Sequence, residues 1–122
     1  MQVQFQMLGS NIPNENKKFD LESRFVDFAV SAAIFSKGLP HDVVGLYYGD
    51  QLLRSGGSAA LNFGEAEGTV SKKDYVYKAT LCLKELKESR VNLKVVNKML
   101  YGDKPKRGQL IKIVATIIKN KR

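Results

Sequence analysis

Residues 51–90 read QLLRSGGSAALNFGEAEGTVSKKDYVYKATLCLKELKESR. Polar and small residues recur in this stretch every three or four positions, the spacing at which side chains share one face of a helix. A helix packed by apolar contacts alone would carry leucines at these positions. The pattern therefore predicts two helices joined by a specific buried polar network. Its predicted members are Arg54 (with Ser55 as the alternative), Ser58, Asn62, Glu65, Glu85 and Glu88.

The first of these two helices is predicted to cover residues 42–67. Each glycine inside a helix costs up to about 1 kcal/mol relative to alanine, so propensity alone would break this segment. Close approach of its backbone to another helix would explain the glycines, whereas a helix–loop–helix break at Gly56 and Gly57 is the alternative. The interior glycines are Gly45, Gly49, Gly56, Gly57 and Gly64.

The second helix is predicted to begin after Ser71, because Asp74 three residues later completes a variant of the capping box. We expect it to run for about 30 residues, or roughly 45 Å, until Gly102 and Pro105 end it. Its core-facing stripe is Tyr75, Ala79, Cys82, Leu86, Leu93, Val96 and Leu100.

Two shorter helices flank this pair. Asp20 is a candidate N-cap for the first helix, and Gly38 and Pro40 end it. The last helix is predicted over residues 108–119. Their apolar stripes are Leu21, Phe25, Phe28, Ala32 and Phe35, and Leu110, Ile113, Val114, Ile117 and Ile118.

Short connections between these helices predict an all-α, antiparallel up-down four-helix bundle over residues 19–122. Residues 1–18 form an N-terminal extension in which Val3, Phe5 and Met7 alternate with glutamines. This extension is either an arm that adds to a neighbouring molecule or, as we favour, a flexible segment.

Composition excludes several classes of protein. A chain of 122 residues fits one domain. Its single cysteine, Cys82, forms no internal disulfide, and His41 lies too far from it in the sequence for a zinc motif. The N-terminus does not read as a signal peptide, and the longest apolar run, residues 28–35, is too short to span a membrane. We expect a cytoplasmic protein with no metal, no cofactor and no membrane partner.

Charge is unevenly distributed along the chain. Residues 1–68 carry five Lys/Arg against eight Asp/Glu, a net charge of −3, whereas residues 69–122 carry fifteen against four, a net charge of +11. Such asymmetry favours a polyanionic partner for the C-terminal half. The alternative is that the lysines serve only solubility.

The sharpest sign of a partner is a row of cations along the predicted third helix. At about 100° per residue, five lysines fall within an arc of about 80°, well away from the apolar stripe. Such a row is suited to tracking a phosphate backbone, and a solvated lysine face without a ligand is the alternative. The predicted nucleic-acid-binding residues are Lys73, Lys84, Lys87, Lys94 and Lys98, with Arg90 widening the arc.

The polar network is interpreted as structural. Arg54 is expected to pair with Glu85 or Glu88 across the helix interface, because buried charges must be paired. A catalytic alternative would use Glu65 and Glu85 as paired carboxylates, but the sequence offers no nucleophile, metal set or histidine beside them. No phosphate-binding glycine motif is present. We therefore expect no enzymatic activity.

The motif run also carries a family resemblance. It comprises Gln51-Leu52-Leu53-Arg54-Ser55, Ser58, Asn62, Glu65-Ala66, Ser71-x-Lys73-Asp74-Tyr75, Lys78-Ala79 and Leu83-Lys84-Glu85-x-x-Glu88-Ser89-Arg90. These residues resemble the bacterial four-helix-bundle proteins encoded by intervening sequences of 23S ribosomal RNA genes, over roughly residues 19–118. The chain is similar too to the accessory variability determinant of diversity-generating retroelements, a basic pentamer that binds nucleic acid and a reverse transcriptase.

The resemblance implies a cytoplasmic bundle that assembles into a ring-like homopentamer without an established enzymatic activity. In that family Arg54, Asn62, Glu65, Glu85 and Glu88 would be structural signature positions. Two functions follow as hypotheses. One is a self-assembling protein that binds nucleic acid, RNA in preference, without sequence specificity. The other is an oligomeric scaffold that docks a partner protein such as a polymerase or a ribosomal factor.

Overall fold

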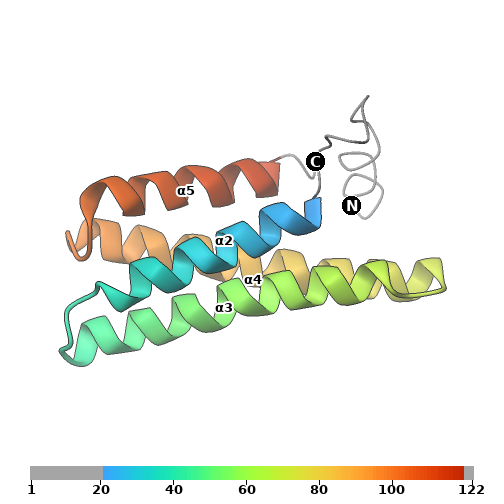
Figure 1. The fold of residues 1–122 in the computed structure, drawn as a ribbon, viewed down its shortest axis with the longest axis horizontal. Helices are drawn as coiled ribbons and strands as arrows, with labels where there is room; N and C mark the ends of the chain where they lie inside the picture. Colours follow the sequence, from blue (N-terminus) through green and yellow to red (C-terminus); the bar gives the residue numbers. More distant parts are fainter. Residues whose placement is uncertain (1–20, 120–122) are drawn as a thin grey trace.

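The computed structural model describes residues 21–119. The predicted extension at residues 1–18, the candidate N-cap Asp20 and the chain from Asn120 onward lie outside these residues. The described part of the chain is entirely helical, which confirms the all-α prediction (Figure 1). Its helices are α2 (Leu21–Lys37), α3 (Val43–Glu67), α4 (Lys72–Lys98) and α5 (Lys104–Lys119). No helix in this part of the chain is long and apolar enough to cross a membrane.

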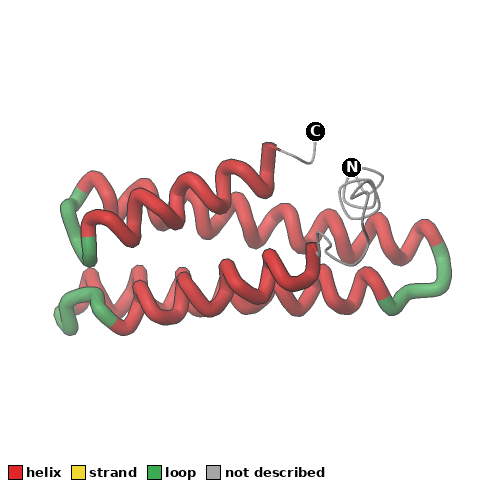
Figure 2. Tube along the Cα trace, turned by 45° about the horizontal axis from the view of Figure 1, so that its top comes forward, coloured by secondary structure: helices red, strands yellow, loops and turns green. Residues whose placement is uncertain are grey.

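Helices that follow one another in the sequence pack side by side. α3 contacts α2 on one side and α4 on the other, α4 contacts α5, and α5 closes back onto α2. Figure 2 shows the chain running up and down through short loops, as predicted for an up-down bundle. α3 and α4 are the longest helices, and their hairpin extends beyond the start of α2 and the end of α5 (Figure 1).

The apolar stripes predicted from the sequence form the core. Phe25 of α2 stacks on Phe63 of α3 with ring centroids 4.8 Å apart, and Leu86 and Leu93 of α4 are fully buried in the same core. Leu100 departs from the prediction: it lies beyond the end of α4 and is 74% exposed. Ile113 and Ile118 are half-buried where burial was expected.

α3 runs unbroken through its glycines, so the alternative of a break at Gly56 and Gly57 is wrong. A Cβ on Gly56 would lie 3.3 Å from the Ala32 methyl carbon, and a Cβ on Gly45 would overlap the carbonyl of Pro40. These glycines let α3 approach α2 and the loop before α3. The predicted close approach to another helix is confirmed at Gly56, whereas Gly45 approaches a loop.

Asp42 ties together the two loops at one end of the bundle. Its Oδ1 accepts a hydrogen bond from the Gly45 amide at 2.7 Å, which caps α3, and its Oδ2 accepts one from the Tyr101 hydroxyl at 2.8 Å. The bond from the Gly45 amide, followed by that from Tyr101, lowers the pKa of Asp42. The α2–α3 loop is thereby joined to the turn between α4 and α5.

The turn between α4 and α5 differs from the prediction. α4 ends at Lys98, where the Tyr101 amide donates to the Val96 carbonyl at 2.9 Å. Leu100 takes the left-handed conformation usual at such a helix end, with φ of 60°. The Leu100 amide also donates to the Asn97 carbonyl at 3.1 Å, so two capping bonds accompany a leucine where glycine is the usual residue.

α5 begins at Lys104, four residues before the predicted start at 108. Asp103 accepts a hydrogen bond from the Lys106 amide at 3.0 Å and so caps the helix. Pro105 lies in the first turn, where a proline costs nothing because the first amides of a helix have no helical partner. The prediction that Pro105 marks the end of the preceding helix is therefore wrong.

Arg107 anchors the first turn of α5. The residue is buried, and its guanidinium group donates to Asn97 Oδ1 at 2.7 Å and to the carbonyls of Tyr101 and Gly102 at 3.1 and 2.8 Å. These bonds satisfy the buried charge and hold α5 against the end of α4.

Gly45→Ala is expected to lower the free energy of unfolding by about 3 kcal/mol, because its methyl group would displace the Pro40 carbonyl. Gly108→Ala is the matched control, since a Cβ there meets nothing within 4 Å. It is expected to raise the free energy of unfolding by up to about 1 kcal/mol. Urea denaturation measures both variants, and equal effects would contradict the close approach.

Candidate nucleic-acid interface

The lysines predicted to bind nucleic acid lie on the solvent side of α4, opposite its core-facing stripe. We call Lys73, Lys84, Lys87, Lys94 and Lys98 the lysine face, and all five are exposed. Among the described residues, Lys84 is the member of this face that lies within 4 Å of a carboxylate, with 3.8 Å between its Nζ and Glu88 Oε2. The remaining ammonium groups are left to solvent or to a partner.

Arg90, predicted to widen this row, is placed differently. The residue is half-buried, and its Nε is inaccessible and has no hydrogen-bond partner among the described residues. On the helical wheel it lies at the flank of α4, between the lysine face and the core. It therefore does not present its whole guanidinium group as the lysines present their ammonium groups.

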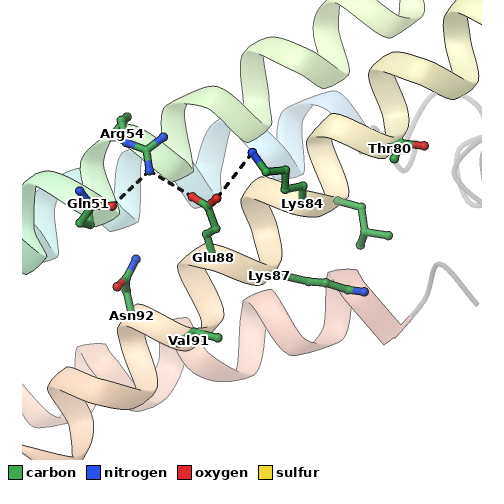
Figure 3. Close-up of a pocket in the computed structure, with 9 residues that line it drawn as sticks. Gln51, Arg54, Thr80, Lys84, Lys87, Glu88, Val91 and Asn92 are labelled. Atoms are coloured by element: carbon green, nitrogen blue, oxygen red, sulfur yellow. Dashed lines mark hydrogen bonds and ion pairs between the residues drawn. The ribbon is translucent and has the colours of Figure 1, made fainter.

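A shallow depression of about 710 Å³ lies against the middle of the lysine face (Figure 3). α3 contributes Gln51 and Arg54 to one side of it. Its remaining lining comes from α4, with apolar groups between charged ones. These α4 residues are Thr80, Leu83, Lys84, Lys87, Glu88, Val91 and Asn92.

Arg54 is the centre of a polar cluster at the α3 side of this depression. Its Nη2 donates to Glu88 Oε1 at 3.1 Å and to Gln51 Oε1 at 3.1 Å, and its Nη1 lies 3.6 Å from Glu85 Oε1. The bond to Glu88 raises the pKa of Arg54. Figure 3 shows Lys84 directed toward the same Glu88 carboxylate. The expected pairing of Arg54 across the helix interface is thus present, with both glutamates.

Glu85 is the most enclosed carboxylate of the cluster. Burial and, after it, repulsion from Glu88 raise the pKa of Glu85, while Arg54 and Lys84 act in the opposite direction. The positive charge of Arg54 therefore offsets the repulsion between the Glu85 and Glu88 carboxylates at the α3–α4 interface.

The other predicted members of the network do not join this cluster. Lys78 Nζ pairs with Glu65 Oε1 at 2.6 Å. Asn62 Nδ2 donates to the Ser58 carbonyl at 2.9 Å, so it binds its own helix and does not cross to α4. The prediction of one buried network is wrong, because most of these side chains lie at the edge of the interface where water reaches them.

Between α3 and α4, a buried polar contact is made by a pair of serines. Ser55 of α3 and Ser89 of α4 are both fully buried, with 2.6 Å between their hydroxyl oxygens. Sequence reasoning treated Ser55 as an alternative to Arg54, whereas both residues cross to α4. The signal for Ser89 was its place in the apolar stripe, three residues after Leu86 and four before Leu93.

The described residues offer little to metal or acid–base chemistry. They contain no cluster of three or more His, Cys, Asp or Glu that could hold a metal ion. Glu65 and Glu85, the carboxylates of the catalytic alternative, are each paired with a different cation, Lys78 and Arg54. What this surface can do chemically is bind an anion through the lysine face.

Comparison with known proteins supports the fold and the resemblance. No protein-family model matches the chain, and no curated protein matches it. The structure is similar to the crystal structure, at 1.70 Å resolution, of a protein of unknown function from the S23 ribosomal protein family of Bacteroides thetaiotaomicron. The two share 26% identity over 82% of this chain and 93% of that chain, with a TM-score of 0.72. The resemblance to the family encoded by 23S rRNA intervening sequences is thereby confirmed.

Ser55→Ala is expected to lower the free energy of unfolding by about 1–2 kcal/mol, because it leaves the buried Ser89 hydroxyl without its partner. Adding Ser89→Ala to this variant is expected to cost little more, since no hydroxyl then remains unpaired. A double-mutant cycle by urea denaturation gives the coupling, expected at about 1 kcal/mol. Fully additive costs would show that the two hydroxyls do not depend on each other.

Proposed function

We propose that this chain is a small, self-associating protein that binds nucleic acid, RNA in preference, through the lysine face of α4. The observation that carries the proposal is the row of exposed, almost unpaired ammonium groups along one side of a single helix. A purely solubilising surface would more often alternate both signs of charge. The similar protein from the S23 ribosomal protein family supports RNA as the ligand, because that family is associated with ribosomal RNA genes.

The geometry of the lysine face suits a phosphate backbone. Lys73 and Lys98 are 25 positions apart, about 37 Å along a helix. Cations within this length recur every one to three turns on one side of α4, and the half of the chain that contains them carries a net charge of +11. Contacts of this kind position a nucleic acid without reading its bases. We expect weak sequence preference and a steep loss of affinity with salt.

Reversing three lysines tests the proposal. The variant Lys84→Glu, Lys87→Glu and Lys94→Glu is expected to lose binding to labelled RNA, and the wild-type protein is expected to lose affinity steeply between about 50 and 200 mM salt. Fluorescence anisotropy at several salt concentrations measures both, after nuclease treatment of the protein. Circular dichroism should show an unchanged helix content, because all three side chains are exposed.

The matched control reverses three exposed lysines of α5, namely Lys104, Lys106 and Lys112, for the same change of net charge. It is expected to weaken binding much less than the α4 variant. Equal losses from the two triple variants would mean that net charge alone attracts the ligand. Undiminished affinity in the α4 variant would refute the lysine face as the site.

Self-association is the second part of the proposal, and an apolar row on α3 supports it. Leu46, Leu53 and Leu61 are exposed and lie on the outward side of α3, with Gly57 and Gly64 between and after them. A Cβ on Gly57 would meet nothing within 4 Å, and one on Gly64 only the Glu22 carboxylate at 3.9 Å. These two glycines cost helix stability without an evident gain inside the chain. Close packing of a second copy against this α3 outer row would supply that gain, and the family resemblance favours a ring-like pentamer.

Leu53→Lys combined with Leu61→Lys is expected to convert the assembly to monomers, because each charge would be buried unpaired between copies. Size-exclusion chromatography with light scattering measures the mass. Val70→Lys, at a 98% exposed loop position, is the control and should leave the mass unchanged. A wild-type protein that is monomeric at tens of micromolar would overturn self-association, and the α3 outer row would then favour the scaffold alternative with a partner protein.

A further inference from the structure

Several uncharged residues interrupt the lysine face, and two of them expose much apolar or aromatic surface. Tyr77 is 62% exposed and Val91 is 56% exposed. Tyr77 lies four positions after Lys73, and Val91 lies four positions after Lys87, so both share the solvent side of α4 with the lysines. The face therefore alternates cations with apolar or aromatic surface along its length.

The lining of the depression against the middle of the face mixes apolar and charged side chains. Leu83, Lys87 and Val91 follow one another at intervals of four, so Lys87 lies between the two apolar side chains, and Thr80 and Lys84 also line the depression. Figure 3 shows Lys84 and Lys87 diverging, Lys84 toward Glu88 and Lys87 away from it. Apolar surface, above all that of the exposed Val91, is thus left open beside the two ammonium groups.

This alternation distinguishes between forms of nucleic acid. A duplex hides the faces of its bases and offers a straight helix mainly phosphates and sugars, so exposed apolar groups between the lysines would gain nothing from it. A single strand offers phosphates and base faces together, and proteins that bind single strands combine cations with aromatic side chains on which bases stack.

We propose that the ligand of the lysine face is a single-stranded nucleic acid, with one base stacked on Tyr77 and another lying on the exposed apolar side chain of Val91 in the depression. The inference rests on the proposed function and names its ligand more closely. Phosphates between these two bases contact Lys84 and Lys87. Tyr77 and Val91 are 14 positions apart, about 21 Å along the helix, which leaves room for several nucleotides between the two bases.

Tyr75, which is buried, and Tyr101 are not available for this role. The Tyr101 hydroxyl donates to Asp42 at the end of the bundle, a bond that raises the pKa of Tyr101. An acidic peptide is also compatible with cations beside apolar surface. The row favours a polynucleotide, because it repeats along most of the 27 residues of α4 and is not gathered into one deep pocket.

The experiment compares one unstructured 20-nucleotide RNA with its blunt duplex, by fluorescence anisotropy on the full-length protein at about 100 mM salt. The wild-type protein is expected to bind the single strand more tightly. Tyr77→Ala is expected to weaken single-strand binding by about tenfold and to leave duplex binding unchanged, and Tyr77→Phe is expected to retain the wild-type affinity. Tyr47→Ala, at a tyrosine of α3 that is 54% exposed, is the matched control without effect.

The outcomes separate this inference from the proposed function. Equal affinity for the two forms, or no effect of Tyr77→Ala while reversal of the lysines still abolishes binding, overturns the single-strand inference and leaves nucleic-acid binding standing. Absence of wild-type binding to either form at low salt overturns both. Competition by polyglutamate as effective as by unlabelled RNA of equal charge also overturns the inference and favours an acidic protein partner.

Discussion

The close approach between α2 and α3 is the constraint on which the rest of the bundle depends. Gly56 brings the α3 backbone against Ala32, and Gly45 leaves room for the Pro40 carbonyl in the loop before α3. With the helices this close, aromatic side chains from both stack in the interior and α4 packs on the remaining side of α3. The apolar stripe of α4 packs against α3 and α5 together, so its opposite side stays in solvent. The lysine face exists because α4 has one neighbour-facing side and one free side.

Polar contacts then set how α3 and α4 are aligned lengthwise. Three pairs join α3 to α4, namely Arg54 with Glu88, Ser55 with Ser89 and Glu65 with Lys78. In each pair the midpoint in the sequence is residue 71 or 72, beside the loop that joins the two helices, so the three pairs belong to one antiparallel alignment. A shift of one helix turn would break all three contacts at once and leave the buried serine hydroxyls unpaired, which is costly in a low-dielectric interior. The same alignment places Arg54 beside Glu88 and Lys84, and so forms one side of the depression on the lysine face. Structural and proposed binding residues thus meet at one interface.

Sequence periodicity was sufficient for most of the architecture and insufficient at two kinds of position. The stripes of α2 and, except for Leu100, of α4 were correct because large apolar residues spaced at three and four have one way to leave water. The start of α5 was wrong because Pro105 is compatible with either the end of one helix or the first turn of the next. Only the caps supplied by Asp103 and the bonds of the buried Arg107 distinguish these two cases. Likewise, a repeat of polar residues does not reveal whether each side chain crosses to a neighbour or, like Asn62, binds its own helix.

By itself, the sequence determined that the protein is a helical bundle, which residues of α2 and, apart from Leu100, of α4 face its core, and that lysines gather along one side of α4. These features follow from side-chain polarity and the 3.6-residue period, which act locally. The tertiary structure decided which polar residues are paired, which are buried and where a surface is hollowed. Ser55 and Ser89 meet 34 positions apart, and Gln51 and Arg54 of α3 line one depression together with residues of α4. Such outcomes depend on distances between helices, and no local pattern specifies those distances.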